Sequence, residues 1–273
     1  MSFSNLGLSP KVLSAVEAAG FETPTPIQAK AVPVAVTGRD VLGIAQTGTG
    51  KTASFVLPML TRLERGRARA RMPRTLILEP TRGLAAQVAE HFETLGKNHK
   101  LTMALLIGGV SYDDQDRKLD RGADVVIATP GRLLDHFVRG KLLLNGIEIL
   151  VVDEADRMLD MGFIPDVERI CKLLPFTRQT LFFSATMPPE IESLAAKILN
   201  QPVRVAVTPV SSTAEKIEQS VYFVEKAQKR GLLLHVLKDP SIVRALVFTR
   251  TKHGANRVAE ALASGGVKAM AIH

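Results

Sequence analysis

Two short stretches of the chain carry residue types that bind and transfer phosphate. The first, Ala45 to Thr52, reads AQTGTGKT and stands between an apolar run and a helix-like segment. Backbone N–H groups of a Gly-rich loop form a concave anion site, and the helix after the loop points its positive end at the same place. Lys51 would reach the β and γ phosphates of a nucleotide, and the Thr52 hydroxyl would bind Mg²⁺. The general pattern has Gly where this chain has Ala45, and a plain surface turn is the alternative.

The second stretch is acidic and lies about 100 residues further along. An apolar run at 147–152 ends in Asp153-Glu154-Ala155-Asp156. Open α/β sheets bind ligands at the carboxyl ends of their strands, so these carboxylates are expected beside the phosphate loop. Asp153 would hold Mg²⁺ through water, and Glu154 would orient and deprotonate an attacking water molecule. Alone, an acidic run after a strand indicates a helix N-cap; together with the loop it indicates phosphoryl transfer.

The elements that must position these residues follow an α/β pattern. Short apolar runs alternate with helix-period segments, and the runs are apolar on both faces, as buried parallel strands are. The expected class is therefore a doubly wound α/β fold with a parallel sheet. Pro58 lies inside the helix after the phosphate loop and should kink it. The expected strands are 41–45, 75–79, 102–106, 124–128, 147–152, 180–184 and 203–207.

A second, shorter region follows residue 207. Residues 208–216 lack periodicity and indicate a linker. Beyond them the pattern predicts strands at 217–224, 245–249 and 267–273, with helices at 226–238 and 254–263. These residues are too few for a second sheet of the first one's size, so we expect the truncated start of a second domain.

Composition narrows the class of partner. The 273 residues are 46% hydrophobic and 23% charged, with a net charge of +8 and a pI of about 9.7, which favours a polyanionic partner. Six arginines between Arg62 and Arg74 against Glu64 supply +5 of this excess (6 − 1), either as a solvated loop or as a nucleic-acid contact. No apolar run reaches the ~18 residues of a membrane span, and no signal peptide is visible. A single cysteine, Cys171, is typical of a protein in a reducing cytoplasm. Its amphipathic surroundings favour a buried packing role over that of a nucleophile.

The residues at 153–156 spell DEAD, and the chain resembles the DEAD-box ATP-dependent RNA helicases, with the family's motifs in order. The resemblance implies a RecA-like domain that uses ATP and Mg²⁺. Residues of about 1–29 are similar to the family's Q motif, in which an aromatic ring stacks on adenine and a glutamine reads its edge. The resemblance therefore assigns adenine stacking to Phe21 and adenine reading to Gln28, and it matches Phe3 to the family's upstream aromatic residue. The loop that it assigns to ATP comprises Ala45, Gln46, Thr47, Gly48, Thr49, Gly50, Lys51 and Thr52.

Further motifs imply an RNA partner gripped through its phosphate backbone. Each is a Gly, Thr or Arg cluster just after an expected strand, so N–H groups, hydroxyls and guanidinium groups could face phosphates on one sheet edge. Such binding should weaken steeply with salt. Ser184 and Thr186 are similar to the motif that couples ATP state to duplex opening, by bonding towards Asp156. The residues implied for RNA are Pro80, Thr81, Arg82, Gly108, Gly109, Thr129, Pro130, Gly131 and Arg132.

Two departures from the family pattern bear on activity. Gly83 stands where the family has glutamate after Pro-Thr-Arg, which should weaken coupling to RNA. The late motifs of the second domain, which supply arginine fingers, are not found in these residues, and an arginine finger is worth roughly 10³–10⁵ in rate. We therefore expect residues 1–273 to bind nucleotide but to hydrolyse it poorly.

The resulting prediction is a cytoplasmic RNA helicase with no membrane partner. Its domains would be 1–207 (RecA-like, ATP-binding), 208–216 (linker) and 217–273 (partial second RecA-like domain). The Arg-rich stretch favours a bacterial RhlE-like type. A nucleotide-gated RNA clamp or scaffold without turnover and a DNA translocase on the same core are the alternatives.

Overall fold

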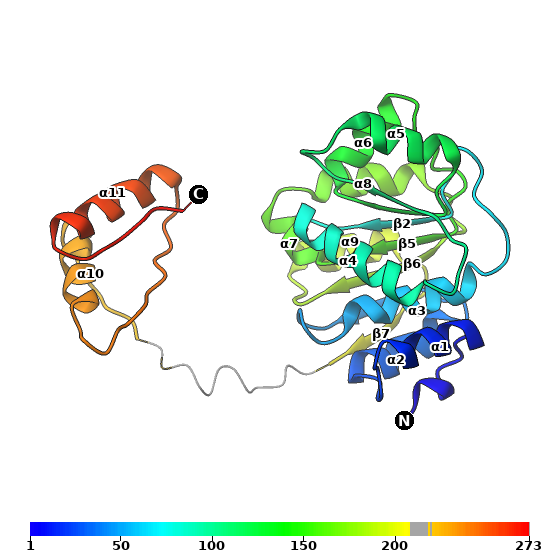
Figure 1. Ribbon diagram of the computed structural model, residues 1–273, viewed down its shortest axis with the longest axis horizontal. Helices are drawn as coiled ribbons and strands as arrows, with labels where there is room; N and C mark the ends of the chain where they lie inside the picture. The colour runs from blue at the N-terminus through cyan, green and yellow to red at the C-terminus, as the bar shows by residue number, and fades with distance from the viewer. Residues whose placement is uncertain (208–217, 219, 273) are drawn as a thin grey trace. The chain divides into compact units, whose positions relative to one another are not determined.

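The structure is a computed structural model that describes residues 1–207, 218 and 220–272. The chain divides into two compact units, Met1–Val210 and Ser211–His273. The linker expected at 208–216 lies outside the described residues. Figure 1 shows the helices and strands of each unit.

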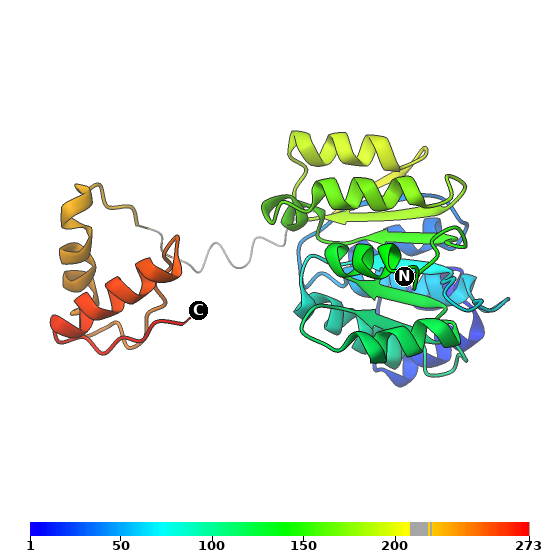
Figure 2. The same cartoon turned by 90° about the horizontal axis from the view of Figure 1, so that it is seen from above.

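The first unit is built on one parallel sheet of seven strands, in the order β3-β4-β2-β5-β6-β1-β7. Helices lie on both sides of the sheet (Figure 2). All seven expected strands are present, and their boundaries differ from the expected ones by at most two residues. The strands are β1 (Val41–Ile44), β2 (Thr75–Leu78), β3 (Met103–Leu106), β4 (Val125–Ala128), β5 (Ile149–Val152), β6 (Gln179–Ser184) and β7 (Val203–Ala206).

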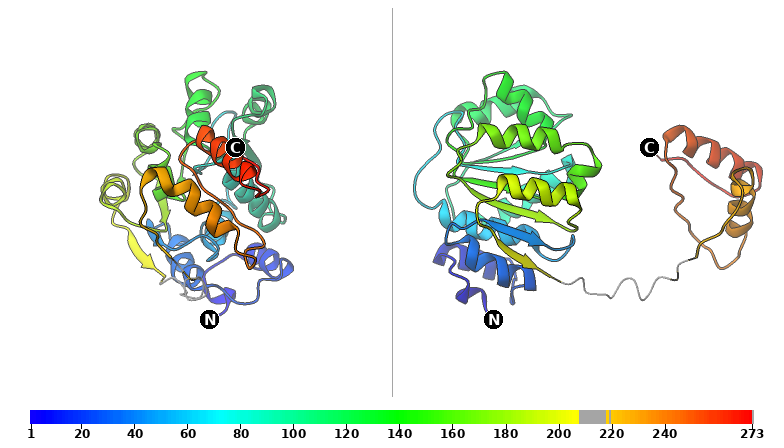
Figure 3. Two further views of the ribbon diagram at one scale, coloured as in Figure 1. Left: turned by 90° about the vertical axis from the view of Figure 1, so that its left-hand side faces the viewer. Right: turned by 180° about the vertical axis from the view of Figure 1, so that it is seen from behind.

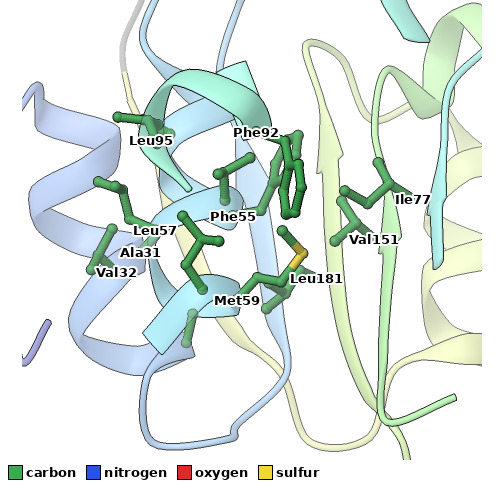
Figure 4. Close-up of a cluster of buried hydrophobic side chains, with 14 of the residues drawn as sticks. Ala31, Val32, Phe55, Leu57, Met59, Ile77, Phe92, Leu95, Val151 and Leu181 are labelled. Carbon is green, nitrogen blue, oxygen red and sulfur yellow. The ribbon is translucent and has the colours of Figure 1, made fainter. Parts of the chain in front are cut away.

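Helices α1 to α4 cover one face of this sheet. Side chains from these helices pack on the alternate strand residues that point to their side, such as Ile77, Val151 and Leu181 (Figure 4). Phe55 of α3 and Phe92 of α4, both labelled in the figure, are two of the aromatic members of this cluster. The elements are the 3-10 helix η1 (Phe3–Asn5), α1 (Pro10–Ala18), α2 (Pro26–Ala35), α3 (Lys51–Arg62) and α4 (Arg82–Leu95).

Helices α5 to α9 cover the opposite face. Their apolar residues pack on Leu76, Val126, Val152 and Phe182, the strand residues of the other alternation. The right-hand view of Figure 3 shows α8 and α9 on this face. Cys171 is buried in α8, and burial raises the pKa of its thiol to about 11, so it serves as core packing. The helices are α5 (Tyr112–Arg121), α6 (Pro130–Val138), α7 (Ala155–Asp160), α8 (Ile164–Leu173) and α9 (Pro189–Ile198).

Parallel strands place the site candidates that follow them at one edge of the sheet. The phosphate loop follows β1, Pro80 to Arg82 follow β2, and the acidic run follows β5. Gly108 and Gly109 follow β3, Thr129 follows β4, and Thr186 follows β6. The Arg-rich segment joins the end of α3 to the start of β2, so it lies at the opposite edge, where Arg71 pairs with Asp120 at 2.7 Å.

The second unit contains the 3-10 helix η3 (Lys226–Gln228), α10 (Lys229–Leu237) and α11 (Lys252–Ser264), which agree with the two predicted helices. The strands predicted at 217–224, 245–249 and 267–273 are wrong for the residues described there, which form no ladder with a neighbour. Phe223 and Phe248 are 96% and 86% exposed. An alternating apolar segment becomes a strand only where another strand accepts its hydrogen bonds. No helix among the described residues is long and apolar enough to span a membrane.

Gly43 in β1 tests the packing between the sheet and α3. A Cβ at this position would overlap the ring of Phe183 on β6, which itself packs on Phe55 with ring centroids 5.7 Å apart. We expect Gly43→Ala to lower the free energy of unfolding by about 1–3 kcal/mol, the usual cost of overpacking a core. Gly83→Ala is the matched control, because a Cβ there meets no atom within 4 Å. Urea unfolding followed by circular dichroism measures both, and an equal effect of the two variants would contradict the prediction.

Candidate nucleotide and RNA site

Glycines set the course of the phosphate loop. Gly48 and Gly50 have φ angles of +84° and +88°, which L side chains rarely adopt. Gly50 is the N-cap of α3, and a Cβ there would lie 2.6 Å from Nε2 of Gln28. The loop therefore leads into the amino end of a twelve-residue helix, where N–H groups and the helix dipole favour an anion.

The carboxamide of Gln28 ties the amino-terminal segment to this loop. Its oxygen accepts a hydrogen bond from Thr25 N at 2.9 Å, and its nitrogen donates to Gly50 O at 3.2 Å. One N–H and one lone pair of the amide remain for a further partner. The ring of Phe21 stacks on Phe3 with centroids 6.3 Å apart, and Phe3 is only 5% exposed. Phe3 therefore supports Phe21 from within the core.

Lys51 is held by the acidic run. Its Nζ lies 2.7 Å from Oε1 of Glu154 and 3.5 Å from Oδ1 of Asp153, and the three side chains are at most 8% exposed. Burial alone would lower the pKa of Lys51, but the two carboxylates outweigh it and raise that pKa, so the ammonium stays charged. Thr47 also donates to Glu154 Oε1, at 3.0 Å. In the free protein Lys51 is therefore ion-paired with Glu154, the residue predicted to act as the base.

The backbone at Glu154 is unusual. Its φ and ψ are 54° and 46°, a left-handed conformation that is uncommon for a residue other than glycine. Its N–H donates a hydrogen bond to Oδ1 of Asp153 at 2.9 Å. Conformations of this kind cost about 1–3 kcal/mol and concentrate at functional sites, where surrounding structure enforces them.

Glu79 joins the same cluster and was not predicted from the sequence. It follows β2 and is completely buried. Burial and the neighbouring carboxyl of Asp153 hold the pKa of Glu79 well above its usual range. The sequence signal is an acidic residue directly after an apolar strand, one position before Pro80-Thr81-Arg82.

The site fits Mg²⁺ together with a phosphate ligand. The predicted donors are oxygens, from the Thr52 hydroxyl and the Asp153 carboxylate, which suit a hard cation. Among the described residues, no three acidic, histidine or cysteine side chains form a group that could hold a metal ion by themselves. Mg²⁺ commonly keeps several waters and binds through one or two carboxylates plus substrate phosphates, so this donor set is compatible with it.

Ser184 and Thr186 meet Asp156 directly. Asp156 N donates to Ser184 Oγ at 3.1 Å, and Thr186 donates to Asp156 Oδ2 through its hydroxyl at 2.9 Å and through its N–H at 3.1 Å. Burial raises the pKa of Asp156, but the hydrogen bonds from Thr186 and Ser184 outweigh it, and the net pKa is lowered. The segments after β5 and β6 are thus joined beside the phosphate loop.

The segments predicted for RNA also contact one another. Thr81 caps α4 by accepting from Leu84 N, and Arg82 donates to Gly108 O at 3.3 Å. Arg132 lies 3.9 Å from the centroid of the Tyr112 ring, a cation–π contact. Gly109, with φ +77°, leaves room for Arg82, whose guanidinium a Cβ would strike.

A buried polar link, also missed from the sequence, braces these segments. His136 Nε2 lies 2.7 Å from Gln115 Oε1, and Gln115 donates to Ile107 O at 3.0 Å, next to Gly108. His136 Nδ1 lies 3.1 Å from Asp116 Oδ1. A histidine and a glutamine on two different helices give no sequence signal of this contact.

Comparisons with known proteins agree with this geometry. The family model described as DEAD/DEAH box helicase matches residues 25–194. The chain therefore belongs to the DEAD/DEAH box helicase family. It is 44% identical to the ATP-dependent RNA helicase DeaD of Mycobacterium tuberculosis H37Rv, over 99% of this chain and 47% of that protein. It is 42% identical to DeaD of Escherichia coli K12, over 100% of this chain and 43% of that protein.

A third relative is the DEAD-box ATP-dependent RNA helicase RhpA of Helicobacter pylori, at 40% identity over 100% of this chain and 54% of that protein. Among solved structures, a DEAD box protein from the hyperthermophile Methanococcus jannaschii matches with a TM-score of 0.72 and 38% identity, over 100% of this chain and 73% of that one. The chain thus spans about half the length of the curated relatives it matches. The RhlE-like subgroup stays a prediction.

The contact between Thr186 and Asp156 predicts a pH effect. We expect Thr186→Val to raise the pKa of Asp156, since the variant keeps the shape but loses the hydroxyl donor. A lowered pKa in the folded state stabilises the protein above the ordinary Asp pKa, and this contribution is lost as the pH falls through the folded-state pKa. Thr186→Val should therefore unfold more readily at neutral pH, and the difference should shrink in acid.

Titration of the Asp156 carboxyl carbon by NMR measures this shift directly. Thr186→Ser, which keeps a hydroxyl, is the matched control and should retain the lowered pKa. An unchanged pKa of Asp156 in Thr186→Val would show that this hydroxyl does not hold the carboxylate.

Proposed function

We propose that this chain is the ATP-binding part of an ATP-dependent RNA helicase that separates short duplexes locally. The observation that carries the proposal is the buried lysine–carboxylate cluster at the phosphate loop, on the sheet edge that also bears the three candidate RNA segments. Residues 1–207 form its ATP-binding domain, 208–216 a linker and 217–273 the first part of a second RecA-like domain.

The residues divide the work as follows. The loop N–H groups and Lys51 bind the phosphates. When Lys51 contacts a phosphate, its ion pair with Glu154 breaks. Asp153 and Thr52 would hold Mg²⁺, which would supply positive charge against the charge that develops on the phosphates. Glu154 then orients a water molecule and takes its proton. Phe21 and Gln28 contact the adenine.

The proposed RNA contacts are made to the sugar–phosphate backbone of the RNA. Pro80 to Arg82, Gly108 with Gly109, and Thr129 to Arg132 present hydroxyls, N–H groups and guanidinium groups to phosphates, which gives affinity without sequence specificity. Asp156, Ser184 and Thr186 link this surface to the nucleotide, because they join two of the loops at the edge. The RNA substrate is therefore single-stranded or duplex RNA held by its sugar–phosphate chain.

The first experiment measures ADP and ATP binding and ATP turnover of residues 1–273, with and without single-stranded RNA. We expect nucleotide to bind, Lys51→Ala to abolish binding, and turnover to stay slow when RNA is added. Glu154→Gln is the matched variant, because it keeps the loop intact and removes only the base. Absence of nucleotide binding by the unmodified chain would contradict the proposal.

The second candidate is a nucleotide-gated RNA clamp without turnover. It is favoured by one observation, the engagement of Glu154 by both Lys51 and Thr47. RNA would then change nucleotide affinity and leave the rate unchanged. RNA-stimulated hydrolysis that Glu154→Gln abolishes would exclude the clamp and would also contradict the expected slow turnover of these residues.

Replacing Gly83 with glutamate, the residue of the family pattern, is expected to increase RNA affinity. It is the second residue of α4, is exposed, and has open space at its Cβ position. We expect Gly83→Glu to tighten RNA binding of the nucleotide-bound chain about threefold to tenfold, because removing glycine stabilises the helix start by ~1 kcal/mol and the carboxylate favours the same helix end.

Fluorescence anisotropy with labelled single-stranded RNA measures this affinity. Gly83→Ala separates the two causes, because it restores helix propensity without adding a carboxylate. Equal RNA affinity in Gly83→Glu and the unmodified chain would overturn the interpretation of this departure.

A further inference from the structure

Glu79 lies beside Asp153 at the carboxyl ends of two paired strands. In the register of β2 and β5, Leu78 is opposite Val152, and Asp153 N donates to Leu78 O at 3.2 Å. Ile77 and Val151 point to the α3 side of the sheet (Figure 4). Side chains two positions on share that face, so Glu79 and Asp153 both point toward the start of α3, where Lys51 stands.

In the free protein the carboxyl of Glu79 has only the carboxyl of Asp153 beside it to share a proton with. The residue is 0% exposed, and neither Oε1 nor Oε2 accepts a hydrogen bond from an N–H or hydroxyl group among the described residues. A buried polar group without a partner costs free energy that an apolar side chain of similar size would not. Stability of the free fold therefore gives no reason for an acidic residue here.

The charges around Lys51 indicate a role for an acidic residue at position 79. Glu79, Asp153 and Glu154 place three carboxyls around one cation, Lys51, which is already paired with the other two. When Lys51 turns to a phosphate, the carboxylates of Asp153 and Glu154 lose their only buried positive partner in this cluster. A divalent cation with its water shell restores the balance and offers O–H donors to the unpaired oxygens.

We propose that Glu79 is an outer-sphere ligand of the Mg²⁺ site, accepting hydrogen bonds from water in the cation's shell beside Asp153. The inference rests on the proposed nucleotide-binding function and deepens it. It adds a carboxyl to the two donors predicted from the sequence motifs, the Thr52 hydroxyl and the Asp153 carboxylate, and it gives a role to a buried acid that no N–H or hydroxyl group contacts in the described part of the free protein.

The test is the Mg²⁺ dependence of ADP binding, measured by calorimetry with excess Mg²⁺ and with EDTA. We expect Glu79→Gln to reduce the ratio of the two affinities about tenfold, in the range typical of loss of an outer-shell partner. Affinity in EDTA should not fall, since the variant removes a carboxyl from near the phosphates. Glu90→Gln, on the exposed face of α4, is the matched control for charge and should leave the ratio unchanged.

Two other outcomes would overturn the inference. An equal loss of ADP affinity with and without Mg²⁺, or a ratio unchanged in Glu79→Gln, would show that Glu79 does not act on the cation. A clear fall in the thermal unfolding midpoint of free Glu79→Gln would show that the residue stabilises the free fold instead. Failure of the unmodified chain to bind ADP in either condition would contradict the proposed function itself, and the inference with it.

Discussion

The first unit depends on one electrostatic constraint, a single buried ammonium among three buried carboxyls. The Lys51 ammonium stays charged because Asp153 and Glu154 face it. In turn, Lys51 offsets the cost of burying these two carboxylates at the carboxyl ends of the strands. Lys51, Asp153 and Glu154 pair with one another without a ligand, yet no N–H or hydroxyl group among the described residues donates to Glu79. A site of this kind is stable when free and gains partners when phosphate and a divalent cation enter, which couples occupancy of the loop to the position of the predicted base.

The sheet turns this local constraint into a shared surface. Because all seven strands run parallel, the loops that follow them meet at one edge, and a change at the phosphate loop is next to the segments after β5 and β6. Hydrogen bonds from Thr186 to Asp156 and from Arg82 to Gly108 join neighbouring loops there. The link from His136 through Gln115 to Ile107 joins the last turn of α6 to the first turn of α5 and to the segment after β3. The proposed coupling between the nucleotide and RNA sites would run through these links.

Sequence patterns were sufficient for the first unit because buried parallel strands are apolar throughout and glycines mark the phosphate loop. The strands and the grouping of the motifs at one edge were predictable for that reason. Glu79, Gln115 and His136 were not, since a single polar residue shows its role only when its neighbours in space are known. The strands expected near Phe223 and Phe248 are wrong, because alternation predicts a surface suited to a sheet and says nothing of whether a neighbouring strand is present.

The central claim is that Lys51 exchanges Glu154 for phosphate when nucleotide binds. A crystal structure of residues 1–273 with a non-hydrolysable ATP analogue and Mg²⁺ tests this most directly, through the distance from Lys51 Nζ to Glu154 Oε1, which is 2.7 Å in the free protein. We expect this ion pair to open, Nζ to contact a phosphate oxygen, and Glu154 to face water. An intact Lys51–Glu154 pair with the phosphates bound elsewhere would contradict it.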